Sequence, residues 1–144
     1  MKNYCKFTFI FLLSFCCFPV LADIHFINPS IKVSSGMGKS AAIFMTIKND
    51  TDASDRLMSV TTKSAKKAMF HDTVVSSNGV VKMKHIMMGL EIGVGEEIIL
   101  KSGGKHIMLM GLTEKLKNGS LVKLVLKFKN AGDLETTVVV GDNN

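Results

Sequence analysis

Apolar and polar residues alternate along much of the chain from residue 24 onward, and this period of two predicts β-strands. The pattern is clearest in 121–128, where Val122, Leu124, Leu126 and Phe128 are expected to face a core. No stretch has a helical period of useful length. Nine short strands are predicted, at 24–33, 40–48, 56–62, 68–75, 80–83, 97–101, 105–110, 121–128 and 134–140. The sequence therefore predicts an all-β domain, a sandwich or Greek-key β-barrel of about eight or nine short strands.

Two of the turn signals among these strands predict hairpins. Asn78-Gly79 is a strong hairpin signal and predicts that 68–75 pairs with 80–83. The glycine pair Gly103-Gly104 predicts a second hairpin, between 97–101 and 105–110.

Residues 1–22 have the features of an export signal. Lys2 and Lys6 are followed by an apolar run at 7–18 and then by Val20-Leu21-Ala22. This is the order of a charged region, an apolar region and a cleavage site with a small residue. We expect cleavage after Ala22, a periplasmic mature domain at 23–144 and no transmembrane segment once the signal is removed.

Two other interpretations of this segment are weaker. Cys16 and Cys17 suggest a lipoprotein signal, but Phe15 occupies the place before Cys16 where a small residue is expected. An uncleaved anchor is the second alternative, but the apolar run is short compared with the roughly 20 residues of a membrane-spanning helix.

All three cysteines (Cys5, Cys16 and Cys17) lie in the predicted signal, so the mature chain is expected to have none. It then offers no disulfide, no thiolate nucleophile and no thiolate metal ligand. Blue-copper electron transfer and thiol exchange both need a thiolate, which argues against a redox protein of either kind. No nucleophile, base and orienting acid occur at a recognisable spacing, so we do not expect an enzyme.

The charge of the chain gives no sign of a nucleic-acid partner. The whole chain has 18 basic and 12 acidic residues, a net charge of +6, and loss of Lys2 and Lys6 leaves 16 against 12, or +4. The remaining lysines are scattered along the predicted strands without aromatic residues between them. Nucleic-acid binding needs a concentrated basic patch, so a solvated face is expected instead.

The run KSGGKHIMLMGL at 101–112 carries the first candidate chemistry. In a strand, alternate residues share a face, so His106, Met108 and Met110 are expected to point one way. An imidazole and a thioether two residues apart make half of a site for a soft metal, since thioethers suit Cu(I) and imidazole suits copper generally. The alternative is that the methionines fill gaps in a core.

Further His and Met residues extend this half-site. His71 and Met83 flank the predicted hairpin and are expected to lie opposite each other across it. Together with His106 and Met108 they make two imidazoles and two thioethers, all neutral. Such a set disfavours Mg²⁺ and Ca²⁺, which take oxygen ligands, and structural zinc, which usually takes Cys and His.

The sequence resembles the PCu(A)C family of periplasmic copper chaperones. The resemblance covers nearly all of the mature chain and lies in AAIFMTIKN at 41–49, Asp55-Arg56-Leu57 and GGKHIMLMGL at 103–112. It implies a cupredoxin-like β-barrel that binds Cu(I). The ligands it implies are His71, Met83, His106 and Met108. It also implies delivery of copper to the CuA centre of cytochrome c oxidase subunit II, or to another periplasmic copper chaperone or acceptor.

The spacing departs from the family pattern by one residue in each gap. Eleven residues separate His71 from Met83, and twenty-two separate Met83 from His106, where the family has ten and twenty-one. Met83 therefore has Met87 and Met88 as alternatives. Secondary metal-binding candidates are Met110, His85, Met87 and Met88, although for His85 a surface role is preferred. Four other methionines are expected to be loop or core residues: Met37, Met45, Met58 and Met69.

One function of a different class fits the same strand pattern. A metal-free, immunoglobulin-like β-sandwich that serves as an interaction module would also show short alternating strands. It would not depend on His106 or Met108, so replacement of these residues separates the two hypotheses.

Overall fold

The computed structural model describes residues 23–34 and 39–141, and these ranges form ten strands and no helix. The strands are β1 (Ile24–Val33), β2 (Ser40–Asn49), β3 (Asp55–Thr61), β4 (Ala65–Val75), β5 (Val81–His85), β6 (Leu90–Ile92), β7 (Glu97–Leu100), β8 (His106–Leu112), β9 (Leu121–Phe128) and β10 (Asp133–Val140). The all-β prediction is confirmed. The additional strand is β6, whose three residues are too few to show a period. The described ranges contain no helix long and apolar enough to cross a membrane.

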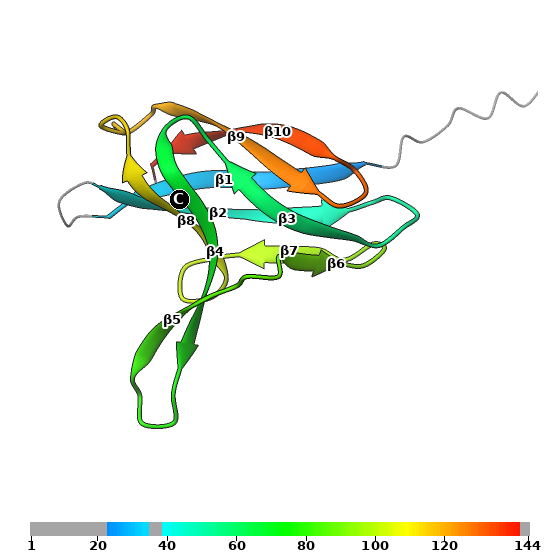
Figure 1. Cartoon of the computed structure of the whole chain (residues 1–144), viewed down its shortest axis with the longest axis horizontal. Coiled ribbons are helices and arrows are strands. Elements are labelled where there is room, and N and C mark those ends of the chain that lie inside the picture. The colour runs from blue at the N-terminus through cyan, green and yellow to red at the C-terminus, as the bar shows by residue number, and fades with distance from the viewer. Residues whose placement is uncertain (1–22, 35–38, 142–144) are drawn as a thin grey trace, which may run out of the picture.

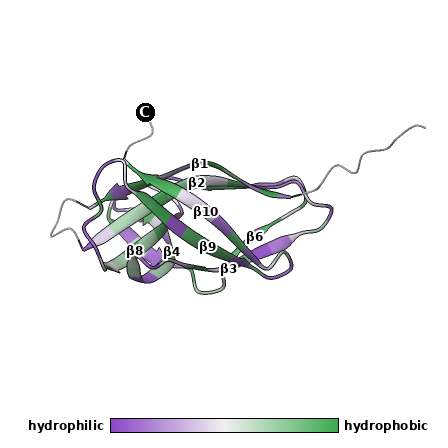
Figure 2. Ribbon diagram, turned by 90° about the horizontal axis from the view of Figure 1, so that it is seen from above, coloured by the Kyte–Doolittle hydropathy of each residue, from purple (hydrophilic) through white to green (hydrophobic). Residues whose placement is uncertain are grey.

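The strands form one sheet that curls over a core (Figure 1). Its order is β5-β4-β8-β2-β1-β10-β9-β3-β6, and β7 pairs with β2 beside β8. The β1–β10 pair is parallel and the others are antiparallel. Several neighbours are far apart in sequence, so the chain crosses over between them, as it does in Greek-key barrels. Seen from above, strands such as β9 and β10 carry both apolar and polar segments (Figure 2).

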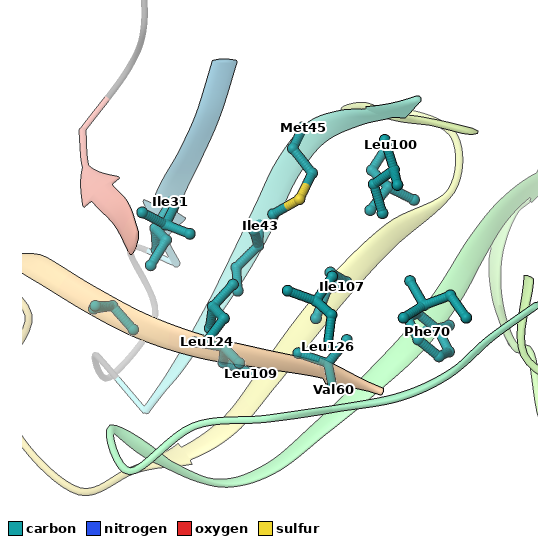
Figure 3. Packing of buried hydrophobic residues seen from close by; sticks show 14 of the residues in the cluster. Ile31, Ile43, Met45, Val60, Phe70, Leu100, Ile107, Leu109, Leu124 and Leu126 are labelled. Atoms are coloured by element: carbon teal, nitrogen blue, oxygen red, sulfur yellow. The ribbon is translucent and has the colours of Figure 1, made fainter. Parts of the chain in front are cut away.

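The core lies between the inward faces of these strands (Figure 3). In β9 the predicted inward residues Val122, Leu124, Leu126 and Phe128 are all buried. The largest fully buried side chains from other strands include Ile31, Ile43, Leu57, Ile107 and Leu109. Because Ile107 and Leu109 point into the core, the residues between and beside them in β8 point to the other face of the sheet.

The glycine pair at 103–104 has a different role from the predicted one. β7 pairs with residues 45–48 of β2, and β8 pairs antiparallel with residues 40–43 of the same strand. Both strands therefore run in one direction along a single edge of β2, and 101–105 forms a loop between them. The predicted hairpin between 97–101 and 105–110 is wrong, because each strand takes β2 as its partner.

The turn signal Asn78-Gly79 does form the predicted hairpin. Gly79 has a φ of 79° and donates its N–H to Ser76 O at 2.8 Å, while Ser76 N–H donates to Val80 O at 2.9 Å. A tight turn followed by a left-handed residue is a common three-residue hairpin loop. The β4–β5 hairpin that it closes projects away from the barrel (Figure 1).

Asp55, the first residue of the Asp55-Arg56-Leu57 sequence, connects β3 to the turn between β9 and β10. Its carboxylate accepts hydrogen bonds from the backbone N–H groups of Arg56 at 2.7 Å, Asn130 at 2.9 Å and Ala131 at 2.8 Å. Burial opposes ionisation, but these bonds outweigh it and lower the pKa of Asp55 below its usual 3.8. This residue therefore ties β3 to the β9–β10 turn and has a structural role.

The packing of Leu109 predicts a large loss of stability on truncation. Leu109 is fully buried on β8, so Leu109→Ala leaves a cavity and is expected to lower the free energy of unfolding by about 2–5 kcal/mol. Leu121→Ala is the matched control, because Leu121 is exposed, and its expected change is within about 0.5 kcal/mol. Urea denaturation measures both, and equal losses in the two variants would contradict this account of the core.

Candidate metal centre

Three histidines form a row across neighbouring strands, here called the imidazole row. His71 on β4 is paired directly with His85 on β5 and with His106 on β8. The ring centroids are 5.6 Å apart for His71 and His85 and 5.9 Å apart for His71 and His106, with nearly perpendicular planes. Directly paired residues share a face of the sheet, so all three side chains lie on the face away from the core. The expected proximity of His71 and His106 is confirmed.

His106 is the buried end of the row. Its residue is only 4% exposed, and its ring lies 6.4 Å from that of Phe44. The Nδ1–H group of His106 donates a hydrogen bond to Gly104 O at 2.9 Å. The loop at 101–105 thus fixes the tautomer, since Nδ1 carries the proton and Nε2 keeps its lone pair. An imidazole oriented in this way is prepared to bind a metal through Nε2.

His71, in the middle of the row, has a nitrogen without a partner. Its Nδ1 is buried and makes no hydrogen bond, and it is the only such side-chain nitrogen or oxygen found in the described ranges. A buried polar group left unpaired costs about 1–3 kcal/mol, so its presence calls for an explanation. Burial, followed by the neighbouring His106 and His85 imidazoles, lowers the pKa of His71 below its usual 6.5. The ring is therefore neutral at pH 7, which is the form that binds metals.

Met108 lies on the face of β8 that the sequence predicted. It shares the outer face of β8 with His106, and it is half-buried. Its direct partner on β4 is Met69, two residues before His71. Met69 is therefore on the same face of the sheet as His71 and His106, and the expectation that it is a loop or core residue is wrong. The signal in the sequence was its spacing of two from His71, which puts both on one face of a strand.

Met83 occupies a different pair from the expected one. It is paired with Thr73, while the residue opposite His71 is His85. The expectation that Met83 lies directly opposite His71 is wrong by two residues, which keeps Met83 on the His71 face, two pairs along the hairpin. A diagonal neighbour at that position is about 7–8 Å away, within reach of a long side chain. Met83 is 63% exposed.

The remaining candidates lie farther out. Met110 shares the face of Met108 but is paired with Lys67 and is exposed. Met87 and Met88 follow the end of β5 and are the most exposed large apolar side chains described, at 85% and 75%. His85 is exposed on the edge strand β5, and its ring lies edge-on to that of His71.

The imidazoles do not make a metal site by themselves. Within 23–34 and 39–141, no three His, Cys, Asp or Glu side chains converge closely enough to hold a metal ion. The imidazole row is extended across three strands and does not point at one centre. Any ion held at His71 and His106 must therefore take its other ligands from a different chemical group, and thioethers are the group that shares this face.

Comparison with known proteins places the chain in a family. The family model described as "Putative lipoprotein LpqE-like" matches residues 24–140. The chain belongs to the LpqE-like family. A curated relative, "Putative lipoprotein Lxx21020" from Leifsonia xyli subsp. xyli (strain CTCB07), is 32% identical over 109 residues. That match covers 76% of this chain and 64% of the relative, so the LpqE-like chain matches less than two thirds of the relative's length.

Solved structures share the fold of this LpqE-like protein. The apo PCuAC domain from PmoF1 has a TM-score of 0.67 and 19% identity, covering 82% of this chain and 92% of that one. The copper-bound PCuAC domain from PmoF2 has a TM-score of 0.66 and 19% identity, covering 81% and 91%. The solution structure of CuI-DR1885 from Deinococcus radiodurans has a TM-score of 0.64 and 28% identity, covering 81% and 76%. The cupredoxin-like fold implied by the sequence resemblance is thereby confirmed.

The lowered pKa of His71 predicts that the metal-free protein is less stable in mild acid. Between the lowered pKa and 6.5, the unfolded chain binds more protons at this residue than the folded chain does. The free energy of unfolding therefore falls as the pH drops below about 6.5. In His71→Gln this contribution is absent, so the decline between pH 7.5 and pH 5 is expected to be smaller. Urea denaturation across this range measures it, and parallel curves for the two proteins would contradict the assignment.

Proposed function

We propose that this LpqE-like protein is an exported Cu(I) chaperone in which His71, Met83, His106 and Met108 hold the ion. The observation that carries the proposal is the unpartnered Nδ1 of His71, whose ring lies 5.9 Å from an imidazole that the loop at 101–105 holds in one tautomer. A cation between these two rings would supply the partner that His71 lacks. The role is carriage of an ion and needs no catalysis.

The donor set is suited to a soft monovalent ion. Thioethers bind Cu(I), and neutral imidazoles accept copper in either common oxidation state. All the proposed ligands are uncharged, so the bound ion keeps its single positive charge. The site faces away from the core, on a sheet whose other face holds Phe70, Ile107 and Leu109, so binding does not require the barrel to open.

The same donors favour release to a stronger site. No thiolate is present in residues 23–144, so capture by this protein is weaker than capture by a cysteine-containing acceptor. The CuA centre of cytochrome c oxidase subunit II is the acceptor that we propose, with another periplasmic copper chaperone as the alternative. Transfer in either case requires only the exchange of ligands around Cu(I).

The names of two of the similar solved structures support this proposal. CuI-DR1885, 28% identical to this chain, was solved with Cu(I), and the PCuAC domain from PmoF2 was solved with copper bound. Both share the fold on which His71 and His106 meet here. The second thioether is the least constrained part of the set, because Met69 lies beside Met108 in the same pair of strands while Met83 is diagonal to His71.

Anaerobic titration of the mature protein with Cu(I) against a competing chelator tests the ligand set. We expect one tightly bound Cu(I) per chain. Loss of a residue that only supports a metal ligand typically lowers metal affinity by roughly 10- to 100-fold. We expect at least this loss of Cu(I) affinity from each single replacement of a ligand: His71→Gln, His106→Gln, Met108→Leu and Met83→Leu. Leucine keeps the size of methionine and removes only the sulfur.

Two variants serve as matched controls for this titration. His25→Gln removes an imidazole on β1 whose Nε2 lies 3.6 Å from Asp50 Oδ2, and Met58→Leu removes an exposed thioether on β3. Neither should change the affinity. If Met69→Leu weakens binding and Met83→Leu does not, Met69 replaces Met83 in the set. An absence of Cu(I) binding in the unaltered protein would instead favour the metal-free interaction module.

Export is the second part of the proposal. We propose that the signal at 1–22 is cleaved after Ala22 and that the domain is periplasmic; these residues lie outside the described ranges. The names of the family and of the relative both contain the word lipoprotein, which favours the lipidated alternative more than the residues before Cys16 do. Either route exports the domain, so both agree with a periplasmic chaperone.

The mass of the mature protein from cells distinguishes these routes. We expect a chain that begins at Asp23 and carries no lipid, because a small residue precedes the proposed cut. Intact mass spectrometry of the protein from the membrane and soluble fractions measures this directly. A chain that begins at Cys16 or Cys17 and has the added mass of a diacylglyceryl group would show that the lipoprotein alternative is correct.

A further inference from the structure

We propose that His85, Met87 and Met88 form a second, outer Cu(I) site through which the ion enters and leaves the site at His71 and His106. This inference rests on the proposed function and extends it from holding copper to exchanging it. The outer site is defined as these three residues, and the inner site as His71, Met83, His106 and Met108.

The exposure of the two methionines is the first observation. Met87 and Met88 are 85% and 75% exposed, whereas the other methionines in the described ranges are less so. An exposed apolar side chain contributes no burial free energy to the stability of the fold. Two adjacent exposed methionines therefore suggest a binding role for their sulfur atoms. Both residues follow His85 within three positions and line with it a groove of about 800 Å³.

The segment that carries these methionines is fixed at both ends. Ile86 N–H donates to Phe70 O at 2.9 Å, which continues the pairing of β5 with β4. Gly89 has a φ of 73° and sits so close to β3 that a Cβ atom there would clash with Leu57 O. Met88 O accepts a hydrogen bond from Arg56 Nη1 at 3.5 Å. The backbone under the two thioethers is therefore anchored, although the side chains are in water.

The imidazole row connects this segment to the inner site. Burial increases along it, from exposed His85 through half-buried His71 to His106, which is 4% exposed. The His85 and His71 rings are 5.6 Å apart, a distance that one ion can span by exchanging ligands. The three rings do not converge on a single centre, so they fit successive positions of one ion better than a single site with three imidazoles.

The exchange step changes only the bonds to copper. A bond from Cu(I) to His71 breaks as a bond to His85 forms, and bonds to the inner thioethers are replaced by bonds to Met87 or Met88. Copper stays in the +1 state, and no proton moves as long as the imidazoles are neutral. Because the outer ligands are exposed, an acceptor can approach the ion there and displace them.

Stopped-flow transfer of Cu(I) from the loaded protein to the small chelator bathocuproine disulfonate tests this path. The variant combines His85→Gln, Met87→Leu and Met88→Leu. We expect its equilibrium affinity to stay within about threefold of the parent, while the transfer rate falls roughly tenfold, the change that about 1.4 kcal/mol in a barrier produces. A variant with His25→Gln and Met58→Leu is the matched control and should transfer at the parent rate.

Each other outcome overturns the proposal in a distinct way. An unchanged transfer rate would mean that the outer residues take no part in exchange. A tenfold or greater loss of equilibrium affinity would make His85 a ligand of the inner site. Failure of the unaltered protein to bind Cu(I) would remove the proposed function itself, a result that is separate from all of these.

Discussion

The whole candidate site depends on the alternation of side chains along β4 and β8. Phe70 on β4 and Ile107 on β8 are paired and both point into the core. Because successive residues of a strand face opposite ways, His71 and His106 are forced onto the outer face, directly beside each other. The free energy that holds the two imidazoles together therefore comes from the burial of apolar residues on the other side of the same sheet.

This dependence explains which parts of the site were predictable. The common face of His106, Met108 and Met110 follows from spacing within one strand, a local property that the sequence shows directly. The inward residues of β9 were predictable for the same reason. The meeting of His71 with His106 required a pairing between strands over thirty residues apart, which no spacing within one strand can show.

What could not be predicted is the register between strands. Gly79 takes the left-handed position in the turn, and the resulting loop pairs His71 with His85 where Met83 was expected. The turn signal indicated a hairpin but did not fix its register, which depends on loop length and turn type. Likewise, Gly103 and Gly104 signalled a turn but not that β7 and β8 both pair with β2. Met69 was missed although its spacing of two from His71 puts both residues on one face of a strand.

The remaining question is whether this arrangement fits a protein without a metal equally well. An interaction module would have no reason to bury His71 Nδ1 without a partner, at a cost of about 1–3 kcal/mol. Nor would it need the loop at 101–105 to hold His106 in one tautomer. Together these features give one imidazole that lacks a partner and a second that presents a free lone pair, with the two ring centroids 5.9 Å apart. A soft cation satisfies both, so we favour the metal-binding interpretation.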